Sequence, residues 1–188
     1  MKRQRGMLLL EVLVSMLIAT VALLGTVLLI GRSSRGEMES YQRVQALTLV
    51  QDMVSRINAN RQVASCYSSG STGLVVGAGA GTLPTCAAAS PLPSALQAST
   101  ANTDITAWNN ALLGAGEVSG GNNVGAMIGA IGCVDQVDAT NNIYRITVAW
   151  QGLTSTVAPQ LACGKNKFGS EAQRRTVSVQ IRIANLSS

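Results

Sequence analysis

The feature that most constrains this chain is an uncharged apolar run close to its N-terminus. The 20 residues from Val12 to Gly31 contain no charged side chain and no proline. A helix of this length can cross the hydrocarbon core of a bilayer. The few hydroxyl residues in the run, Ser15, Thr20 and Thr26, can return their hydrogen bonds to the helix backbone. The pattern therefore predicts a single-pass membrane helix.

A carboxylate at the start of the run separates it from ordinary export segments. Glu11 follows four apolar residues, and a charge in hydrocarbon is rare without a role. A secretory signal peptide would end in a small-residue cleavage site, whereas this run leads into Arg32 and Arg35. A plain signal anchor explains the span but leaves Glu11 unexplained. After a cut behind Gly6, Glu11 would be the fifth mature residue and could pair with the new α-amino group of Met7 on a neighbouring copy.

Beyond Arg35 the chain becomes amphipathic. Apolar residues recur every three or four positions, which predicts a helix with one face packed on a domain. The stretch Gly31–Glu39 is polar but contains no proline, so we predict one helix from about Leu8 to about Arg61. Its expected packing face consists of Tyr41, Val44, Leu47, Val50, Val54 and Ile57, with Gln42, Arg43 and Gln45 among the residues on the other sides.

The chain has no histidine and four widely spaced cysteines. Without histidine the commonest general base and metal ligand are missing, so we expect no catalysis, no metal and no cofactor. Cys66, Cys86, Cys133 and Cys163 form no C-x-x-C pair, and behind a membrane-directed segment they favour two disulfides in an oxidising compartment. The preferred pairs are Cys66 with Cys86 and Cys133 with Cys163. Four cysteines allow three pairings, and the sequence does not choose among them.

The remaining residues predict a small α+β head. A short helix is expected over Thr103–Leu113, capped by Thr103 or Asp104, with Trp108 in the core. Period-two alternation over Tyr144–Gln151 and Thr176–Ile183 predicts antiparallel strands with one face on the long helix, and Val124–Cys133 is a candidate third strand.

The glycine-rich segment 67–96 is predicted to be a loop, and the Cys133–Cys163 bond is expected to tie the loop around Lys165 to the sheet edge. The predicted fold class is therefore α+β: a long N-terminal helix, apolar in its first half and amphipathic in its second. It packs against a small antiparallel sheet with disulfide-bonded loops.

The N-terminus carries a short basic leader, Gly6, Met7-Leu8-Leu9-Leu10 and Glu11. Together these residues resemble the class III signal of type IV prepilins. The resemblance implies that a prepilin peptidase cuts after Gly6 on the cytoplasmic side. It also implies that the new amine of Met7 is methylated and that Glu11 sets the register between subunits. Such proteins most often carry Phe where this chain has Met7. The chain would then consist of a leader (1–6), a long helix (7–64) and an exported head (65–188).

Two further features are the helix end Ile57-Asn58-Ala59-Asn60-Arg61 and the order Cys133, strand, Cys163, closing strand. Both are similar to those of the PilV family of minor pilins. The resemblance implies a non-enzymatic protein that joins other minor pilins and the major pilin to initiate type IV pilus assembly and twitching motility, with adhesion at the tip as an added role. Its partners would include the inner-membrane assembly machinery. The head would lie in the periplasm before assembly and in the extracellular pilus afterwards. The alternative is a minor pseudopilin of a type II secretion system, which would share Gly6, Glu11 and the long helix.

The charge balance argues against nucleic-acid binding. The net charge is +5, but without Lys2, Arg3 and Arg5 the 14 basic residues fall to 11 against 9 acidic ones, a charge of +2. DNA capture would need an exposed basic patch. The sequence offers only Arg174-Arg175 with Lys165 and Lys167 for such a patch, which is weak support. Asp135 and Asp138, near Asn141 and Asn142, do not match a calcium loop, and a solvated turn is the favoured interpretation.

Overall fold

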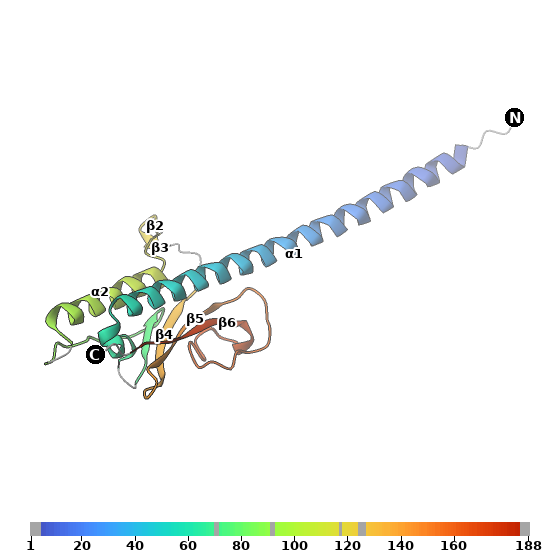
Figure 1. The fold of residues 1–188 in the computed structure, drawn as a ribbon. Helices are drawn as coiled ribbons and strands as arrows, with labels where there is room; N and C mark the ends of the chain where they lie inside the picture. Colours follow the sequence, from blue (N-terminus) through green and yellow to red (C-terminus); the bar gives the residue numbers. More distant parts are fainter. Residues whose placement is uncertain (1–4, 70–71, 91–92, 117, 124–126, 185–188) are drawn as a thin grey trace. The chain divides into compact units, whose positions relative to one another are not determined.

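The structure is a computed structural model that describes residues 5–69, 72–90, 93–116, 118–123 and 127–184. Its elements follow one another along the chain as drawn in Figure 1. The chain consists of two compact units, which divide between Ser40 and Tyr41 inside the first helix.

The first unit is helical throughout its described part. Helix α1 (Arg5–Ala59) begins in this unit and continues into the second. The polar stretch Gly31–Glu39 is part of it, so the prediction of one uninterrupted helix is confirmed. Its end differs slightly from the prediction, because α1 stops at Ala59 and the 3₁₀ helix η1 (Arg61–Ser68) follows.

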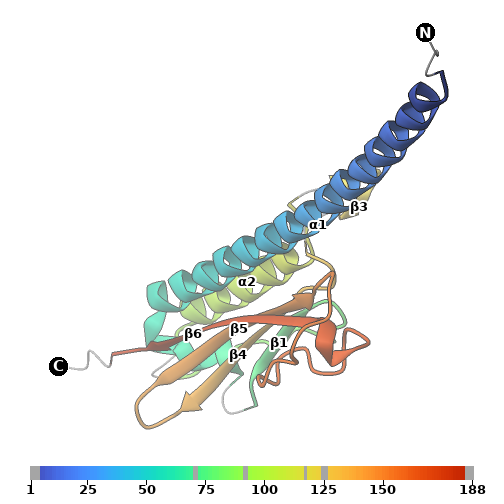
Figure 2. The ribbon, with the colours of Figure 1, turned by 90° about the vertical axis from the view of Figure 1, so that its right-hand side faces the viewer.

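The second unit contains a four-stranded antiparallel sheet in the order β1-β4-β5-β6 (Figure 2). Strands β5 (Ile143–Gln151) and β6 (Arg174–Arg182) confirm the two predicted strands. The third strand was predicted over 124–133, but β4 spans Ile131–Asp138; residues 124–126 lie outside the described part. Strand β1 (Leu74–Gly77) corrects the prediction that 67–96 is all loop, because Leu74-Val75-Val76 pairs with β4.

Besides η1, three short elements of the described part lie outside the main sheet and the two long helices. Strands β2 (Val118–Ser119) and β3 (Asn122–Asn123) pair with each other, away from the main sheet. The 3₁₀ helix η2 (Glu171–Gln173) leads directly into β6.

One sheet face and two helices enclose the main core. The predicted inward face of β5 is confirmed, since Tyr144, Ile146, Val148 and Trp150 are all buried. The predicted face of α1 is partly wrong: Tyr41 is 56% and Val44 60% exposed. The buried row of α1 is rotated away from the predicted face and shares only Val50 and Ile57 with it. It comprises Gln42, Ala46, Val50, Met53 and Ile57.

Helix α2 (Ala95–Leu112) covers the core beside α1. It begins eight residues before the predicted start, because Ser94 is the N-cap and forms a capping box with Gln97. Thr103 and Asp104 are therefore interior residues and not caps. Trp108 is fully buried, as predicted, and its indole N–H donates to the Leu49 carbonyl of α1 at 2.9 Å.

The opposite face of the sheet carries a second, smaller core. It consists of Ile131, Cys133, Ala149, Cys163 and Phe168. The Cys133–Cys163 disulfide is formed, but β4 is an interior strand. The bond therefore fastens the segment 152–173 across the face of the sheet, and not to its edge as predicted.

Arg174 holds the same segment from the start of β6. Its side chain is 1% exposed and donates to the carbonyls of Pro159 (2.9 Å), Leu161 (2.6 Å) and Cys163 (3.0 Å). The guanidinium also donates twice to one carboxylate oxygen of Glu171, at 2.8 and 2.6 Å. One buried cation thus fixes three carbonyl groups of an otherwise irregular segment.

Candidate assembly interface

The apolar part of α1 presents large side chains in every direction. All of its Leu, Ile, Val and Met residues between Leu9 and Ile30 are exposed, from Val14 at 48% to Leu28 at 70%. Within the described part of the chain, α1 is the one helix long and apolar enough to cross a membrane, with a mean hydropathy of 2.6 in its most apolar window. A helix that is apolar all round is stable only in lipid or among other apolar helices.

The polar groups within this segment are satisfied inside the helix. The hydroxyl of Ser15 donates to the Glu11 carbonyl at 2.6 Å. Thr20 and Thr26 donate to the carbonyls of Leu17 and Leu23 at 2.9 and 2.8 Å. This confirms the prediction that these residues return their bonds to the backbone, so they present no unpaired donor to hydrocarbon.

Glu11 is the one charged group of the apolar segment. Its side chain is exposed on α1, and no ion pair between described residues includes it. Gly6 and Met7 lie in the first turns of α1. The side chain of Met7, like residues 1–4, lies outside the described part, so cleavage, methylation and subunit registration stay predictions. The carboxylate of Glu11 is available to another molecule.

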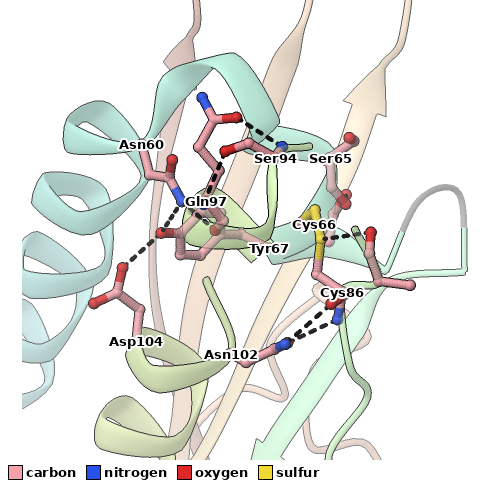
Figure 3. Close-up of a disulfide and its surroundings, with 11 residues drawn as sticks. Asn60, Ser65, Cys66, Tyr67, Cys86, Ser94, Gln97, Asn102 and Asp104 are labelled. Carbon is pink, nitrogen blue, oxygen red and sulfur yellow. Dashed lines mark hydrogen bonds between the residues drawn. A yellow bond between two sulfur atoms is a disulfide. The ribbon is translucent and has the colours of Figure 1, made fainter. Parts of the chain in front are cut away.

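A polar cluster joins the end of α1 to η1 and α2 (Figure 3). The Tyr67 hydroxyl donates to Asp104 at 2.6 Å, and Asn60 donates to the Gln97 carbonyl at 3.0 Å. Arg56 bridges Asp104 (2.8 Å) and Asp52 (2.9 Å).

Burial, and then the bond to Asp104, raise the pKa of Tyr67 well above its usual value. Tyr67 therefore stays protonated as a donor. The hydrogen bonds and ion pairs of this cluster link three helices to one another, which is a positioning role.

The Cys66–Cys86 disulfide lies beside this cluster and confirms the other preferred pairing. Asn102 of α2 accepts from the Cys86 N–H at 2.7 Å and donates to the Cys86 carbonyl at 3.0 Å (Figure 3). This pair of bonds imitates a β-ladder and holds the irregular segment after β1 against α2. Sequence reasoning missed Asn102, which lies one residue before the predicted start of the helix, where its local sequence gave no signal of contact with Cys86.

The suggested basic patch does not form. Arg174 is buried, and the Arg175 guanidinium donates to the carbonyls of Ala172 and Thr154 at 3.1 and 2.6 Å. The carboxylate of Asp138 accepts from the backbone and side chain of Asn141, which agrees with the turn interpretation of that region. The described residues contain no group of three or more His, Cys, Asp or Glu that could hold a metal ion.

Together these elements define a pilin-like α+β architecture. A long N-terminal helix, apolar at first, packs by its second half on a four-stranded antiparallel sheet, with two disulfides in the head. Comparison of the chain with protein-family models, with curated proteins and with solved structures finds no match.

Proposed function

We propose that this protein is a minor pilin of a type IV pilus that helps to initiate pilus assembly. The observation that carries the proposal is Glu11, an exposed carboxylate at the head of a helix that is apolar on all sides. Gly6, five residues before it, supplies the cleavage position that would create a partner amine. The fold supports the same class, since it combines this helix with a compact disulfide-bonded head.

The physical role of Glu11 follows from the cost of burying a charge. When apolar helices pack together, an unpaired carboxylate among them is strongly unfavourable. The α-amino group of Met7 on a neighbouring subunit, one helical turn away along the axis, would neutralise it. Only one axial offset between helices brings the two charges together. The pair therefore selects the register in which a subunit joins the bundle.

A second candidate function is that of a minor pseudopilin in a type II secretion system. It would use the same leader, carboxylate and long helix. The similarity of the helix end at Ile57–Arg61 to the PilV family and the presence of two disulfides favour the pilus. Adhesion at the pilus tip is part of the proposal only as an added role of the head.

An in-frame deletion distinguishes the two functions. The deletion strain is scored for surface pili, twitching motility and secreted hydrolases, with the intact gene restored as the control. We expect loss of pili and motility with normal secretion. Loss of secretion with normal pili would assign the chain to the secretion system instead.

Glu11→Ala tests subunit registration. Removing one partner of a desolvated pair costs about 3–5 kcal/mol, so we expect the amount of this protein in sheared filaments to fall at least about tenfold. Leader cleavage should be largely unaffected. The matched control is Glu37→Ala, which removes the same charge from an exposed position of α1 beyond the apolar run. Normal recovery of the Glu11 variant in filaments would contradict the role of this carboxylate.

Gly6→Val tests the cleavage position. A branched side chain before the scissile bond should block the peptidase, so the protein should remain at its precursor mass on gels and by mass spectrometry. Gly36→Val is the control, since a Cβ at Gly36 meets no atom within 4 Å and lies far from the cut. A mature-sized product from the Gly6 variant would show that cleavage occurs elsewhere.

A further inference from the structure

Strand β6 is an open edge of the main sheet. It is the last strand in the order β1-β4-β5-β6 and pairs with β5 through nine consecutive residues without a bulge (Figure 2). Its central residues Ser178, Val179 and Gln180 and its last residue Arg182 are exposed. The free side of β6 therefore faces solvent over most of its length.

The backbone register shows which groups point outward. At one end of the ladder the Ile183 N–H donates to the Asn142 carbonyl at 3.0 Å, and at the other the Gly152 N–H donates to the Gln173 carbonyl at 2.8 Å. In an antiparallel pair, successive residues alternate between facing the partner strand and facing away. The odd-numbered residues of β6 thus bond to β5, and the N–H and C=O groups of Thr176, Ser178, Gln180 and Arg182 point to the open side.

This edge lacks the features that usually block strand addition. Proteins protect edge strands with proline, inward-pointing lysine, bulges or a covering element. Between Thr176 and Ile181 the chain reads Thr-Val-Ser-Val-Gln-Ile, with no proline, glycine or charge. Such a flat, uncharged run of high β-propensity is a template for another strand.

The side chains define what such a strand should carry. Val177, Val179 and Ile181 form a row on the core side of the sheet, and each is only partly covered, with Val179 36% exposed. Arg182 ends the other row and forms no ion pair with any described carboxylate. The pKa of nearby Asp138 is lowered mainly by hydrogen bonds from Asn141, and only to a small extent by the charge of Arg182. Arg175 stands at the opposite end of the uncharged run.

We infer that the β6 edge accepts an extended segment of another protein as a fifth strand of the sheet. The segment would place alternate apolar side chains beside Val177, Val179 and Ile181 and an acidic side chain near Arg182. Main-chain hydrogen bonds would supply most of the affinity, and the side-chain rows the selectivity. The edge is present whichever filament the chain belongs to, so the inference stands apart from the proposed function.

A second copy of this chain is a poorer occupant. Antiparallel pairing of β6 with itself about Ser178 would bring Arg182 of each copy to the Arg174–Arg175 end of the other. Like charges on paired strands are destabilising. Arg182 is exposed and forms no ion pair with a described carboxylate, so it favours a partner that carries negative charge at this end of β6.

The test is amide exchange of the full chain in detergent micelles, read residue by residue by NMR. The probe is a seven-residue peptide that alternates valine and threonine between two terminal glutamates. At a peptide concentration about ten times its measured Kd, exchange at Thr176, Ser178, Gln180 and Arg182 should slow about tenfold. The amides of Val177, Val179 and Ile181 already bond to β5 and should not change.

Ser178→Pro is the decisive variant, with Ser178→Ala as its control. Proline is tolerated on an edge strand where its missing N–H faced solvent, so Ser178→Pro removes an outward donor but no bond to β5. The peptide should protect the alanine variant and not the proline variant. Thr176→Pro removes the neighbouring outward donor and should behave in the same way, in case Ser178→Pro does not fold.

Three results would overturn the inference. One is unchanged exchange at all four outward amides, and another is equal protection in the proline variants. The third is protection without peptide that rises with protein concentration, which would identify a second copy as the occupant. Replacing the two glutamates of the peptide by glutamines should weaken binding, and equal binding would refute the charge requirement.

Discussion

Arg174→Gln is expected to destabilise the head strongly, because the residue is buried and holds the segment 152–173. The substitution keeps a polar side chain but removes the charge and most of the five hydrogen bonds of the guanidinium. The carbonyls of Pro159, Leu161 and Cys163 lose their donor, and Glu171 loses its cation.

The size of the effect can be worked from the burial of these bonds. The bond to the Cys163 carbonyl is buried, whereas those to Pro159 and Leu161 are part-buried and can be replaced by water. A bond to a charged donor contributes about 2 kcal/mol when water cannot replace it, and about 0.5 kcal/mol for each of the other two gives a total of about 3 kcal/mol. Nothing is added for Glu171, because solvent can stabilise its carboxylate.

The assay is urea unfolding of the full chain in micelles with both disulfides intact. Both tryptophans of the sequence, Trp108 and Trp150, are buried in the head, so their fluorescence reports the head alone. With a slope of about 2 kcal/mol per molar urea, a loss of 3 kcal/mol lowers the midpoint by about 1.5 M.

Lys167→Gln is the matched control, since it removes the same charge from an exposed position of the same segment. Its midpoint should stay within about 0.3 M of the parent, as is usual for surface substitutions. If Arg174→Gln shifted the midpoint no more than Lys167→Gln does, the buried guanidinium would not be what holds segment 152–173, and the reasoning would be refuted.

Three further predictions concern the same unfolding assay. Hydrogen bonds from Arg174, and then from the Asn166 N–H, hold the pKa of Glu171 below its usual 4.5. The ionised carboxylate therefore stabilises the folded head above pH 4.5. This stabilisation is lost as the pH falls through the lowered pKa of the folded state. Below that pH the midpoint of the parent should fall more steeply than that of Glu171→Gln, and parallel curves would exclude this linkage. Burial raises the pKa of Asp135, so its ionised form is disfavoured in the folded head. Asp135→Asn should therefore increase the free energy of unfolding at pH 7 and raise the midpoint, though the gain is less than about 1 kcal/mol because the group is partly exposed. A lower midpoint would show that attraction to Arg145 outweighs burial. In Gly132→Ala the new Cβ would overlap the side chains of Trp108 and Leu112 and should cost about 1–3 kcal/mol, whereas Gly116→Ala, where a Cβ meets nothing within 4 Å, should be silent.

The elements with a strong period were predictable from the sequence. Helix α1 and strands β5 and β6 each follow from one local pattern of the sequence. Both disulfides are the preferred pairs, although the sequence allowed three pairings. Trp108 was predicted to be buried because a large aromatic side chain on one helix face seldom has another place.

The errors arose where tertiary contacts decide between weak local signals. Gln42 was assigned to the polar side of α1, yet it is buried beside Ala46, and its polar side chain gave no local signal that this side packs on the head. Strand β1 is only four residues long and lies within a glycine-rich segment, so its pairing with β4 supplies the signal that its sequence lacks. The early start of α2 was visible in Ser94 and Gln97, whose spacing is that of a capping box.

The functional residues show the same difference between local patterns and tertiary contacts. Glu11 could be singled out from the sequence because a charge in an apolar run is conspicuous. Arg174 could not, since an arginine before a strand reads as a surface residue until segment 152–173 is seen to fold over it. The open edge of β6 is likewise a property of strand order, which no single segment encodes.

The division of the chain inside α1 determines where it can be cut. The head's compact unit begins at Tyr41, and its core includes Ala46, Val50, Met53 and Ile57 from the second half of the helix. A fragment that starts at residue 65, the predicted head boundary, would lack these four side chains and expose the apolar surface that they cover. A protease acting on the intact protein should likewise spare residues 46–57 and find its accessible bonds nearer residue 40. For this protein the last third of the helix belongs to the globular domain, and the apolar segment before it is the removable part.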